Sequence, residues 1–436
     1  MDSQTLPRIS LRNRQVTSIV VALLALLALL VHVSTAVLRL NVFVPYPKII
    51  DFASFYGAAY VLGEGLSPYG WTPENTALLA GRIPVALPDP NSTPMWLVLL
   101  WPLSHVPFEL AATLWTGLLI LISAYCSRRL SKIAGYSSWT AWAIAFLVTI
   151  TFGPVVLTLT LGQNSLFLLL AVLIAGQAII RRSLRWDLAT GASWSVAIAA
   201  KLFPVLWLFV LLLLRRWRML MIAFVSLALL SVLTYIAHPS SSADYWFRFL
   251  PQQAGQYAGA GALDDQSLGA WLDRMTRQHE VATFGVSLEE AQAVEWLPVI
   301  ALTKTQQGIL TNTLLIICAA VVIAVIWRHG EEEPEAALYL WVLLTMLAAP
   351  HMERYNHVLL LPGMAWAWRN GSIGRYLAVG VYVLAAGARL THLWVLLLPP
   401  SIASLFTGFG VIAVLVLGGG MIFILSKGSE TREQSK

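Results

Sequence analysis

One carboxylate near the N-terminus stands in an apolar and aromatic segment, where residues 49–59 read IIDFASFYGAA. Asp51 would lose contact with water in such surroundings, and a desolvated carboxyl group has the raised pKa that suits a general base. Asp is also a good N-cap, and an interfacial helix that begins at Phe52 would use it in that way. The residue types support these two interpretations equally.

Three ionisable side chains, Lys201, Arg389 and His392, lie inside apolar stretches. A charge in such a place is costly and usually faces a cavity or a partner. Lys201 is a candidate to bind an anionic headgroup; the alternative, a side chain that reaches to the membrane surface, fits poorly with its central position. Arg389 is a second candidate for phosphate contact, with a structural ion pair as the alternative.

A compact cationic group follows Pro350, where residues 350–357 read PHMERYNH. His351, Arg354 and His357 suit contact with a phosphate or a sugar. Histidines also bind zinc, but neither an HExxH motif nor a cysteine accompanies these, which argues against a zinc site.

Two short polar motifs remain open between a binding and a structural role. In the GQNS sequence of residues 162–165, Gln163 and Asn164 suit sugar hydroxyls or a phosphate at a helix N-terminus, while a turn with an N-cap explains the same residues. The pair Asp264 and Asp265 suits a divalent cation, while adjacent Asp residues on a surface loop are mostly solvated.

The composition shows what kind of chain must position these residues. Of its 436 residues, 58% are hydrophobic and 11% are charged, and the mean hydropathy is +0.72. Soluble domains carry about 25% charged residues, so these values exclude a soluble enzyme and indicate an all-α polytopic membrane protein. The two cysteines exclude a disulfide scaffold. The net charge of +6 is attributed to membrane topology rather than to nucleic-acid binding.

About twelve transmembrane helical segments are predicted from apolar runs. They are 16–38, 108–126, 138–160, 165–180, 188–200 with 202–214, 219–237, 307–327, 336–349, 357–368, 375–397 and 403–426. Both ends of 188–214 are basic, so this stretch enters and leaves on one side. Lys201 and Pro204 near its centre predict a break between two short helices, because Pro cannot continue a helix.

Basic residues indicate the orientation, since short cytoplasmic loops retain Lys and Arg. With both termini inside, eighteen of the 28 basic residues are cytoplasmic, and their Arg clusters are interpreted as topology determinants. Segments 40–93 and 238–305 then form a first and a large non-cytoplasmic loop of one membrane domain, 1–436. The polar chemistry gathers on the non-cytoplasmic face.

The order of the motifs resembles glycosyltransferase family 87. The similarity spans nearly the whole chain and is carried by DFASFYGAA at 51–59, GLSPY at 65–69, GQNS at 162–165, KLFP at 201–204, QSL at 266–268 and the 350–357 segment. These are enzymes of the GT-C fold that include polyprenol-phosphate-mannose-dependent α-1,2-mannosyltransferases of the PimE type. One departure is NSTP at 91–94, where the family often has Tyr-Pro-Pro.

The resemblance implies an inverting transfer of a sugar, mannose by analogy, from a polyprenyl-phosphate carrier to a hydroxyl of a glycolipid or glycan outside the cytoplasm. Asp51 matches the catalytic Asp of the family and His351 the histidine near it. The substrate-binding residues are expected to be Tyr56, Gln163, Asn164, Lys201, Gln266, Arg354, His357 and Arg389.

No cofactor, metal or nucleic-acid partner is expected, and the plasma membrane of a bacterium is the expected location. Two alternatives stay open: a lipid or sugar transporter or flippase, which would also explain buried cations and a broken helix, and a polymerase or ligase of lipid-linked glycans.

Overall fold

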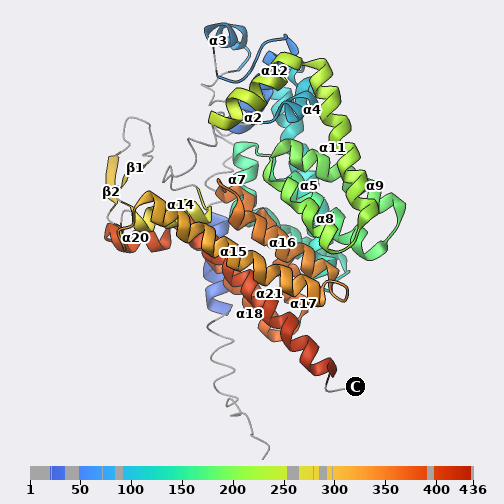
Figure 1. The fold of residues 1–436 in the computed structure, drawn as a ribbon, viewed down its shortest axis with the longest axis vertical. Coiled ribbons are helices and arrows are strands. Elements are labelled where there is room, and N and C mark those ends of the chain that lie inside the picture. Colours follow the sequence, from blue (N-terminus) through green and yellow to red (C-terminus); the bar gives the residue numbers. More distant parts are fainter. Residues whose placement is uncertain are drawn as a thin grey trace, which may run out of the picture.

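The computed structural model describes residues 20, 22–34, 49–70, 72–83, 92–252, 265–277, 279–283, 292–296, 298–389 and 397–433, and these are almost wholly helical (Figure 1). A first helix covers Ala22–Ser34. The elements that follow are α2 (Ile50–Gly63), α3 (Pro73–Leu79), α4 (Pro94–Ser104), α5 (Phe108–Ile133), α6 (Trp139–Thr151), α7 (Gly153–Leu161), α8 (Ser165–Arg181), α9 (Leu184–Ala200), η1 (Phe203–Trp207), α10 (Leu208–Leu213), α11 (Trp217–Ala237), α12 (Pro239–Asp244), η2 (Tyr245–Phe249), α14 (Leu268–Thr276), β1 (His279–Thr283), β2 (Gln292–Trp296), α15 (Lys304–His329), α16 (Pro334–Ala348), η4 (Arg354–Leu359), α17 (Leu360–Arg369), α18 (Gly371–Arg389), α20 (Pro400–Phe406) and α21 (Phe409–Glu433).

Five helices of the described chain are long and apolar enough to cross a membrane: α5, α11, α15, and most of α18 and α21. The bent pair of α6 and α7 makes a sixth if it is counted as one span. Each segment predicted as a span is mostly helical where the structure describes it, although 403–426 is interrupted by a turn between α20 and α21. The total of twelve stays a prediction, because the remaining apolar helices are shorter. One of them, α4, was not predicted, since its 11 residues are too few for a span.

The predicted continuous helix 138–160 is wrong, because the chain bends by 65° between α6 and α7. Pro154 near the start of α7 has no N–H to continue the α6 ladder. The backbone N–H of Gly153 instead donates to Nδ1 of His32, at 2.9 Å, and His32 is fully buried. A histidine of the first helix therefore satisfies the backbone at this break.

The predicted break at Lys201 is present: α9 ends at Ala200, and a 3₁₀ turn starts at Phe203. Pro204 cannot donate to the carbonyl of Ala200, four residues earlier. The Nδ2 group of Asn164 donates to that carbonyl instead, at 3.2 Å. Asn164 occupies the N-cap position of α8, as the turn interpretation of this motif has it, but its side chain makes no cap bond to that helix. It secures the end of α9, which fixes where Lys201 lies.

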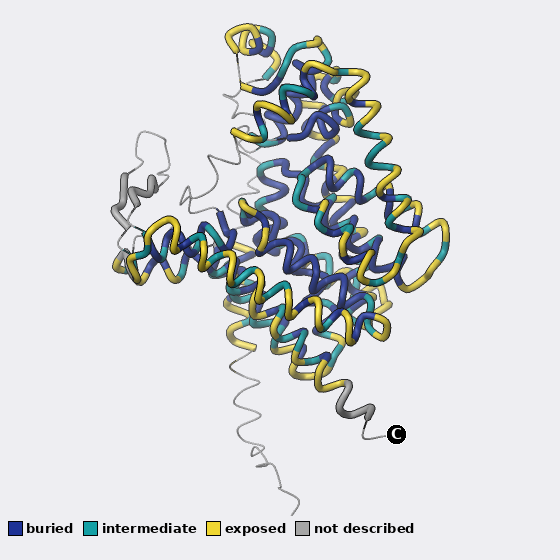
Figure 2. The backbone as a smooth tube through the Cα atoms, viewed as in Figure 1, coloured by how far each residue is buried: buried dark blue, intermediate teal, exposed yellow. Residues whose placement is uncertain are grey.

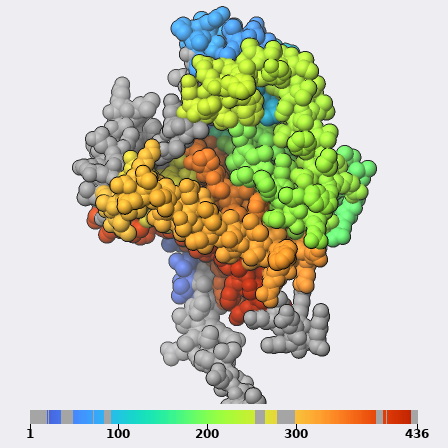
Figure 3. Space-filling model, viewed as in Figure 1, coloured from blue at the N-terminus to red at the C-terminus, as the bar shows by residue number. Residues whose placement is uncertain are grey.

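Burial separates the inner helices from the outer ones (Figure 2). Nearly every residue of α16 and most of α8 are buried, and these two helices pack against each other. By contrast, only 17% of the most apolar window of α11 and 11% of that of α15 are buried. Figure 3 shows α15 running openly across one face of the molecule. Apolar surfaces of this extent fit contact with lipid rather than water.

A two-stranded antiparallel sheet lies within the predicted large loop 238–305 and departs from the predicted all-α fold. Strand β1 pairs with β2 in a register that places His279 opposite Trp296 and Val281 opposite Val294. The sheet does not belong to the membrane-spanning part.

Candidate active site

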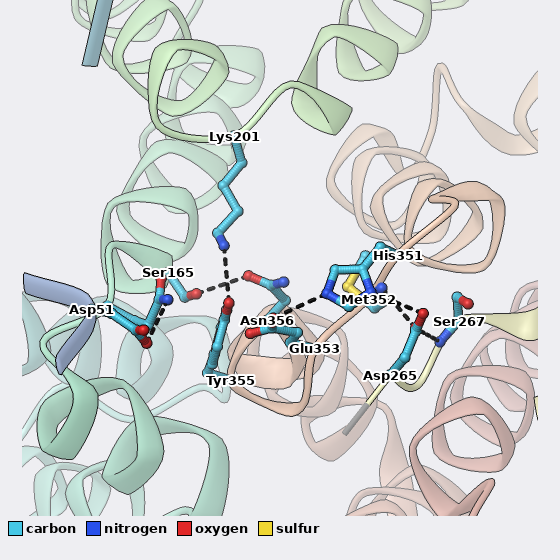
Figure 4. A network of polar contacts seen from close by, with 11 residues as sticks. Asp51, Ser165, Lys201, Asp265, Ser267, His351, Met352, Glu353, Tyr355 and Asn356 are labelled. Atoms are coloured by element: carbon cyan, nitrogen blue, oxygen red, sulfur yellow. Dashed lines mark hydrogen bonds and ion pairs between the residues drawn. The ribbon is translucent and has the colours of Figure 1, made fainter. Parts of the chain in front are cut away.

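Polar side chains from distant parts of the chain meet in one place, shown in Figure 4. Asp51 comes from the first turn of α2, and Lys201 from the end of α9. Gln163 lies in the turn before α8, and Glu353 and Tyr355 lie between α16 and α17. In the view of Figure 4, Lys201 reaches down between Asp51 on one side and Glu353 on the other. One cation is thus placed between two carboxylates.

Asp51 is not the N-cap of a helix that begins at Phe52, so that interpretation is wrong. The helix begins at Ile50, Ile49 takes the cap position, and no side chain caps it. The Asp51 carboxylate instead accepts a hydrogen bond from Nε2 of Gln163, at 2.7 Å. Burial raises the pKa of Asp51 to about 6, and Glu353 adds to the rise, while Gln163 and Lys201 oppose it. This carboxyl group changes its charge near neutral pH, as a general base should.

The 162–165 motif forms the turn that aims Gln163 at Asp51. Gly162 has a φ of +71°, and a Cβ built there would lie 2.6 Å from the side chains of Ile49 and Phe52. Only glycine fits this close approach to α2. Ser165 begins the next helix and donates to Oδ1 of Asn356 at 2.8 Å, which ties the turn to the 350–357 segment.

Lys201 points into the site rather than toward a membrane surface. Its Nζ lies 3.3 Å from the hydroxyl of Tyr355 and 4.6 Å from the centre of that ring. The hydroxyl and the ring face hold the ammonium group in place. The geometry favours the anion-binding interpretation of Lys201 over the one in which it reaches out to solvent.

His351 bridges two carboxylates. Its Nδ1 lies 2.9 Å from Asp265 and its Nε2 lies 3.0 Å from Glu353. Both ring nitrogens donate in such an arrangement, which requires the protonated ring. Burial opposes that charge, but the hydrogen bonds to Asp265 and Glu353 outweigh it and raise the pKa of His351 to about 9. His351 is therefore a cation that binds Asp265 through Nδ1 and Glu353 through Nε2.

Asp265 is the buried carboxylate that supports this arrangement. The interpretation of the Asp264–Asp265 pair as solvated surface residues is therefore wrong for Asp265. It is 1% exposed and accepts from the backbone N–H groups of Ser267, at 2.8 Å, and Met352, at 3.0 Å. Burial opposes its charge, yet the bond from His351 and these N–H groups lower the pKa of Asp265. Asp264 lies outside the described residues.

The hydrogen bonds of protonated His351 to Asp265 and Glu353 predict that the folded protein loses stability at alkaline pH. The pKa of His351 is raised on folding, so its contribution is complete below the unfolded value of about 6.5 and is lost as the pH rises through about 9. We expect the unfolding temperature of the wild type to fall more than that of His351→Gln between about pH 7 and pH 10. Tryptophan fluorescence of protein in detergent measures both curves. If the unfolding temperatures of the two proteins fell equally with pH, the protonated state of His351 between its two carboxylates would be contradicted.

The other predicted binding residues make contacts of a different kind where their side chains are described. Gln266, Arg354 and His357 line a small internal cavity with Gly410, where Oε1 of Gln266 accepts from the Gly410 N–H at 3.1 Å. Arg354 donates to the carbonyl of Ala388 at 3.2 Å. Tyr56 is buried, and its hydroxyl donates to the carbonyl of Val106 at 2.7 Å. Arg389 ends α18, and its side chain is outside the described part of the chain.

Glu353, Tyr355 and Asn356 were not among the predicted site residues. The signal was present, because all three lie within the polar 350–357 segment that also carries His351. Within the described residues, no group of three or more His, Cys, Asp or Glu side chains is arranged to hold a metal ion.

The comparisons with known proteins identify a family. The model of glycosyltransferase family 87 matches residues 93–350, a stretch that contains Gln163, Lys201 and Asp265. Asp51 precedes it and His351 directly follows it. No curated protein and no solved structure matches the chain. Because the family match covers more than half of the 436 residues, the chain belongs to glycosyltransferase family 87.

Proposed function

We propose that this membrane glycosyltransferase moves a sugar, mannose by analogy, from a polyprenyl-phosphate carrier to a hydroxyl of a glycolipid or glycan. The observation that carries the proposal is Asp51, whose carboxyl group has a pKa of about 6 and interacts electrostatically with the Lys201 ammonium group. A base and a cation side by side are what transfer from a phosphate ester to an alcohol requires.

The reaction follows from these two roles. The acceptor oxygen bonds to C1 of the sugar while the bond from C1 to the phosphate oxygen breaks, which inverts the configuration at C1. The hydroxyl proton passes to Asp51. The phosphate leaves with the electron pair of the broken bond, and Lys201 stabilises its charge in a partly desolvated site. Asp265, His351 and Glu353 keep the site in shape, with the His351 cation adding positive charge.

The test is an assay of purified protein with a polyprenyl-phosphate sugar labelled in the sugar. Transfer to a glycolipid acceptor with release of free polyprenyl phosphate supports the proposal. In proteoliposomes, movement of intact donor across the bilayer without cleavage would contradict the proposed sugar transfer and support the transporter alternative.

We also propose that the site faces the non-cytoplasmic side. Thr76 and Ser240 are exposed on the predicted outer loops, and Ser137 is exposed beside the Arg128–Lys132 group predicted to be cytoplasmic. Cysteines at Thr76 and Ser240, in a background without Cys126 and Cys318, are expected to react with an impermeant maleimide in intact cells. A cysteine at Ser137 should react only after lysis. The reverse pattern would place the site on the cytoplasmic side.

Transfer is expected to need no divalent metal, because fixed cations take its place. A divalent ion prefers several oxygen ligands, commonly including more than one carboxylate. Glu353 is held by His351, at 3.0 Å, and the Asp265 carboxylate already interacts with His351, Ser267 and Met352. Activity in excess EDTA should equal the activity with added Mg²⁺ or Mn²⁺. Loss in EDTA with recovery in Mn²⁺ would overturn this expectation.

A further inference from the structure

A second polar site lies at the opposite ends of the helices that carry the candidate active site. Helix α8 begins at Ser165, beside the site, and α9 returns to it at Ala200. Each helix has 17 residues and is therefore about 25 Å long, close to the thickness of the hydrocarbon layer. Their far ends, Arg181 and Leu184, belong to the other membrane face.

Two adjoining clefts open at that face and share Arg182, Arg215 and Arg216. One has a volume of about 470 Å³ and the other of about 280 Å³. Four arginines, including Arg218, stand against two acidic residues, Asp187 and Glu331. The larger cleft is lined by Arg182, Leu213, Leu214, Arg215, Arg216, Ile326, Trp327, Gly330 and Glu331, and the smaller by Arg182, Asp187, Arg215, Arg216, Trp217, Arg218 and Met219.

Among the described residues, two of the four cleft arginines already bind protein acceptors, and two have guanidinium groups without such a partner. Arg218 is bonded to Asp187, and Arg216 donates to the carbonyl of Ile179 at 2.8 Å. Within the described chain, the guanidinium groups of Arg182 and Arg215 have no hydrogen-bonded acceptor or ion-pair partner, and both residues are exposed. Two five-donor groups are thus open to an anion.

The backbone at these two arginines is unusual. Arg182 has a φ of +49° and Arg215 a φ of +53°, and no other non-glycine residue of the described chain has a positive φ. Both follow the end of a helix, at positions where glycine is the favoured residue. An arginine in this conformation is strained where glycine would not be, which directs attention to the function of these two side chains.

The walls of the clefts identify the kind of anion. Leu213 and Ile326 are apolar, and Trp217 and Trp327 are 56% and 86% exposed. Tryptophans in such positions are typical of the boundary between headgroups and hydrocarbon. A soluble phosphate gains no binding energy from apolar walls. A phospholipid, by contrast, can place its phosphate among the arginines and its acyl chains along such walls.

We propose that the Arg182–Arg215 clefts bind the phosphate headgroup of an anionic glycerophospholipid. This site is independent of sugar transfer, because it lies at the far ends of α8 and α9. Each arginine near an anionic membrane surface changes binding about fivefold, so losing two should weaken binding about 25-fold.

The decisive variant is Arg182→Gly with Arg215→Gly. Glycine relieves the positive φ, so the unfolding temperature should stay equal or rise, while both guanidinium groups are lost. The matched control is Arg185→Gln with Arg328→Gln, which removes the same charge from two exposed arginines that line neither cleft. Arg182→Gln with Arg215→Gln, which keeps long side chains, replaces the glycine variant if that variant does not fold.

Binding of phosphatidylglycerol and of phosphatidylcholine to delipidated protein is measured by native mass spectrometry. The wild type and the control should prefer phosphatidylglycerol, and the cleft variant should lose that preference. Equal losses in variant and control, or no preference in the wild type, would overturn the site. If glycerol phosphate displaces phosphatidylglycerol as well as a short-chain phosphatidylglycerol does, the ligand is a soluble phosphate and the lipid assignment is wrong.

Discussion

Asp51→Asn is expected to lower sugar transfer by about 10²–10⁴-fold while donor binding and folding are retained, since that is the usual cost of losing a general base. The substitution keeps the shape of the side chain and its contact with Gln163, but an amide cannot accept the acceptor's proton. Transfer and donor binding are measured separately on purified protein. Asp244→Asn makes the same chemical change on the same predicted face, away from the site, and should leave transfer intact.

The pH dependence of the wild type provides a second readout. The pKa of Asp51 is about 6, so the carboxylate that accepts the proton is lost as the pH falls through that value. We expect kcat/KM to rise with pH through about 6 and then to level off. Near-normal turnover of Asp51→Asn, or a rate that does not change across this range, would remove Asp51 from the mechanism. Glu353 would then be the next candidate.

Lys201→Met is expected to weaken donor binding and to slow turnover together, by about 10- to 100-fold, because a charge-assisted hydrogen bond to the phosphate is lost. Methionine retains much of the length and the apolar stem. Lys201→Arg should recover part of both, since it restores the positive charge. Binding of a polyprenyl-phosphate analogue and single-turnover transfer separate the two effects.

Tyr355→Phe is the matched control for Lys201. It removes the hydroxyl 3.3 Å from Nζ but keeps the ring face on which the ammonium group lies. We expect a much smaller loss from this variant than from Lys201→Met. A Lys201→Met protein that binds donor like the wild type would show that this cation serves folding, and the anion site would have to be sought elsewhere.

The arrangement around His351 changes the role that the sequence suggests for it. As an isolated histidine on a polar turn, it would be free to contact a leaving phosphate. With Asp265 on one nitrogen and Glu353 on the other, both donors are occupied. Its described contacts are therefore those of a positioning residue: a buried carboxylate keeps the ring protonated, and the ring holds Glu353 beside Lys201 and Asp51.

The sequence by itself determined the membrane class, most of the helices and the break at Lys201. These follow from local properties: apolar runs long enough for a bilayer, and a proline that lacks the N–H a helix needs. It also indicated Asp51, Gln163, Lys201 and His351, because polar groups in apolar surroundings are costly and need a purpose. The family resemblance is confirmed by the match over 93–350, which contains Gln163 and Lys201 but neither Asp51 nor His351.

Only the tertiary structure decided what these residues do to one another. The charge of His351 depends on Asp265 and Glu353, and the pKa of Asp51 depends on its burial and on Glu353. The open arginines Arg182 and Arg215 looked like topology signals until their clefts and backbone conformation were seen. Pairings of this kind join residues far apart in the chain, and desolvation and Coulomb interactions depend on distance in space, which periodicity and composition do not encode.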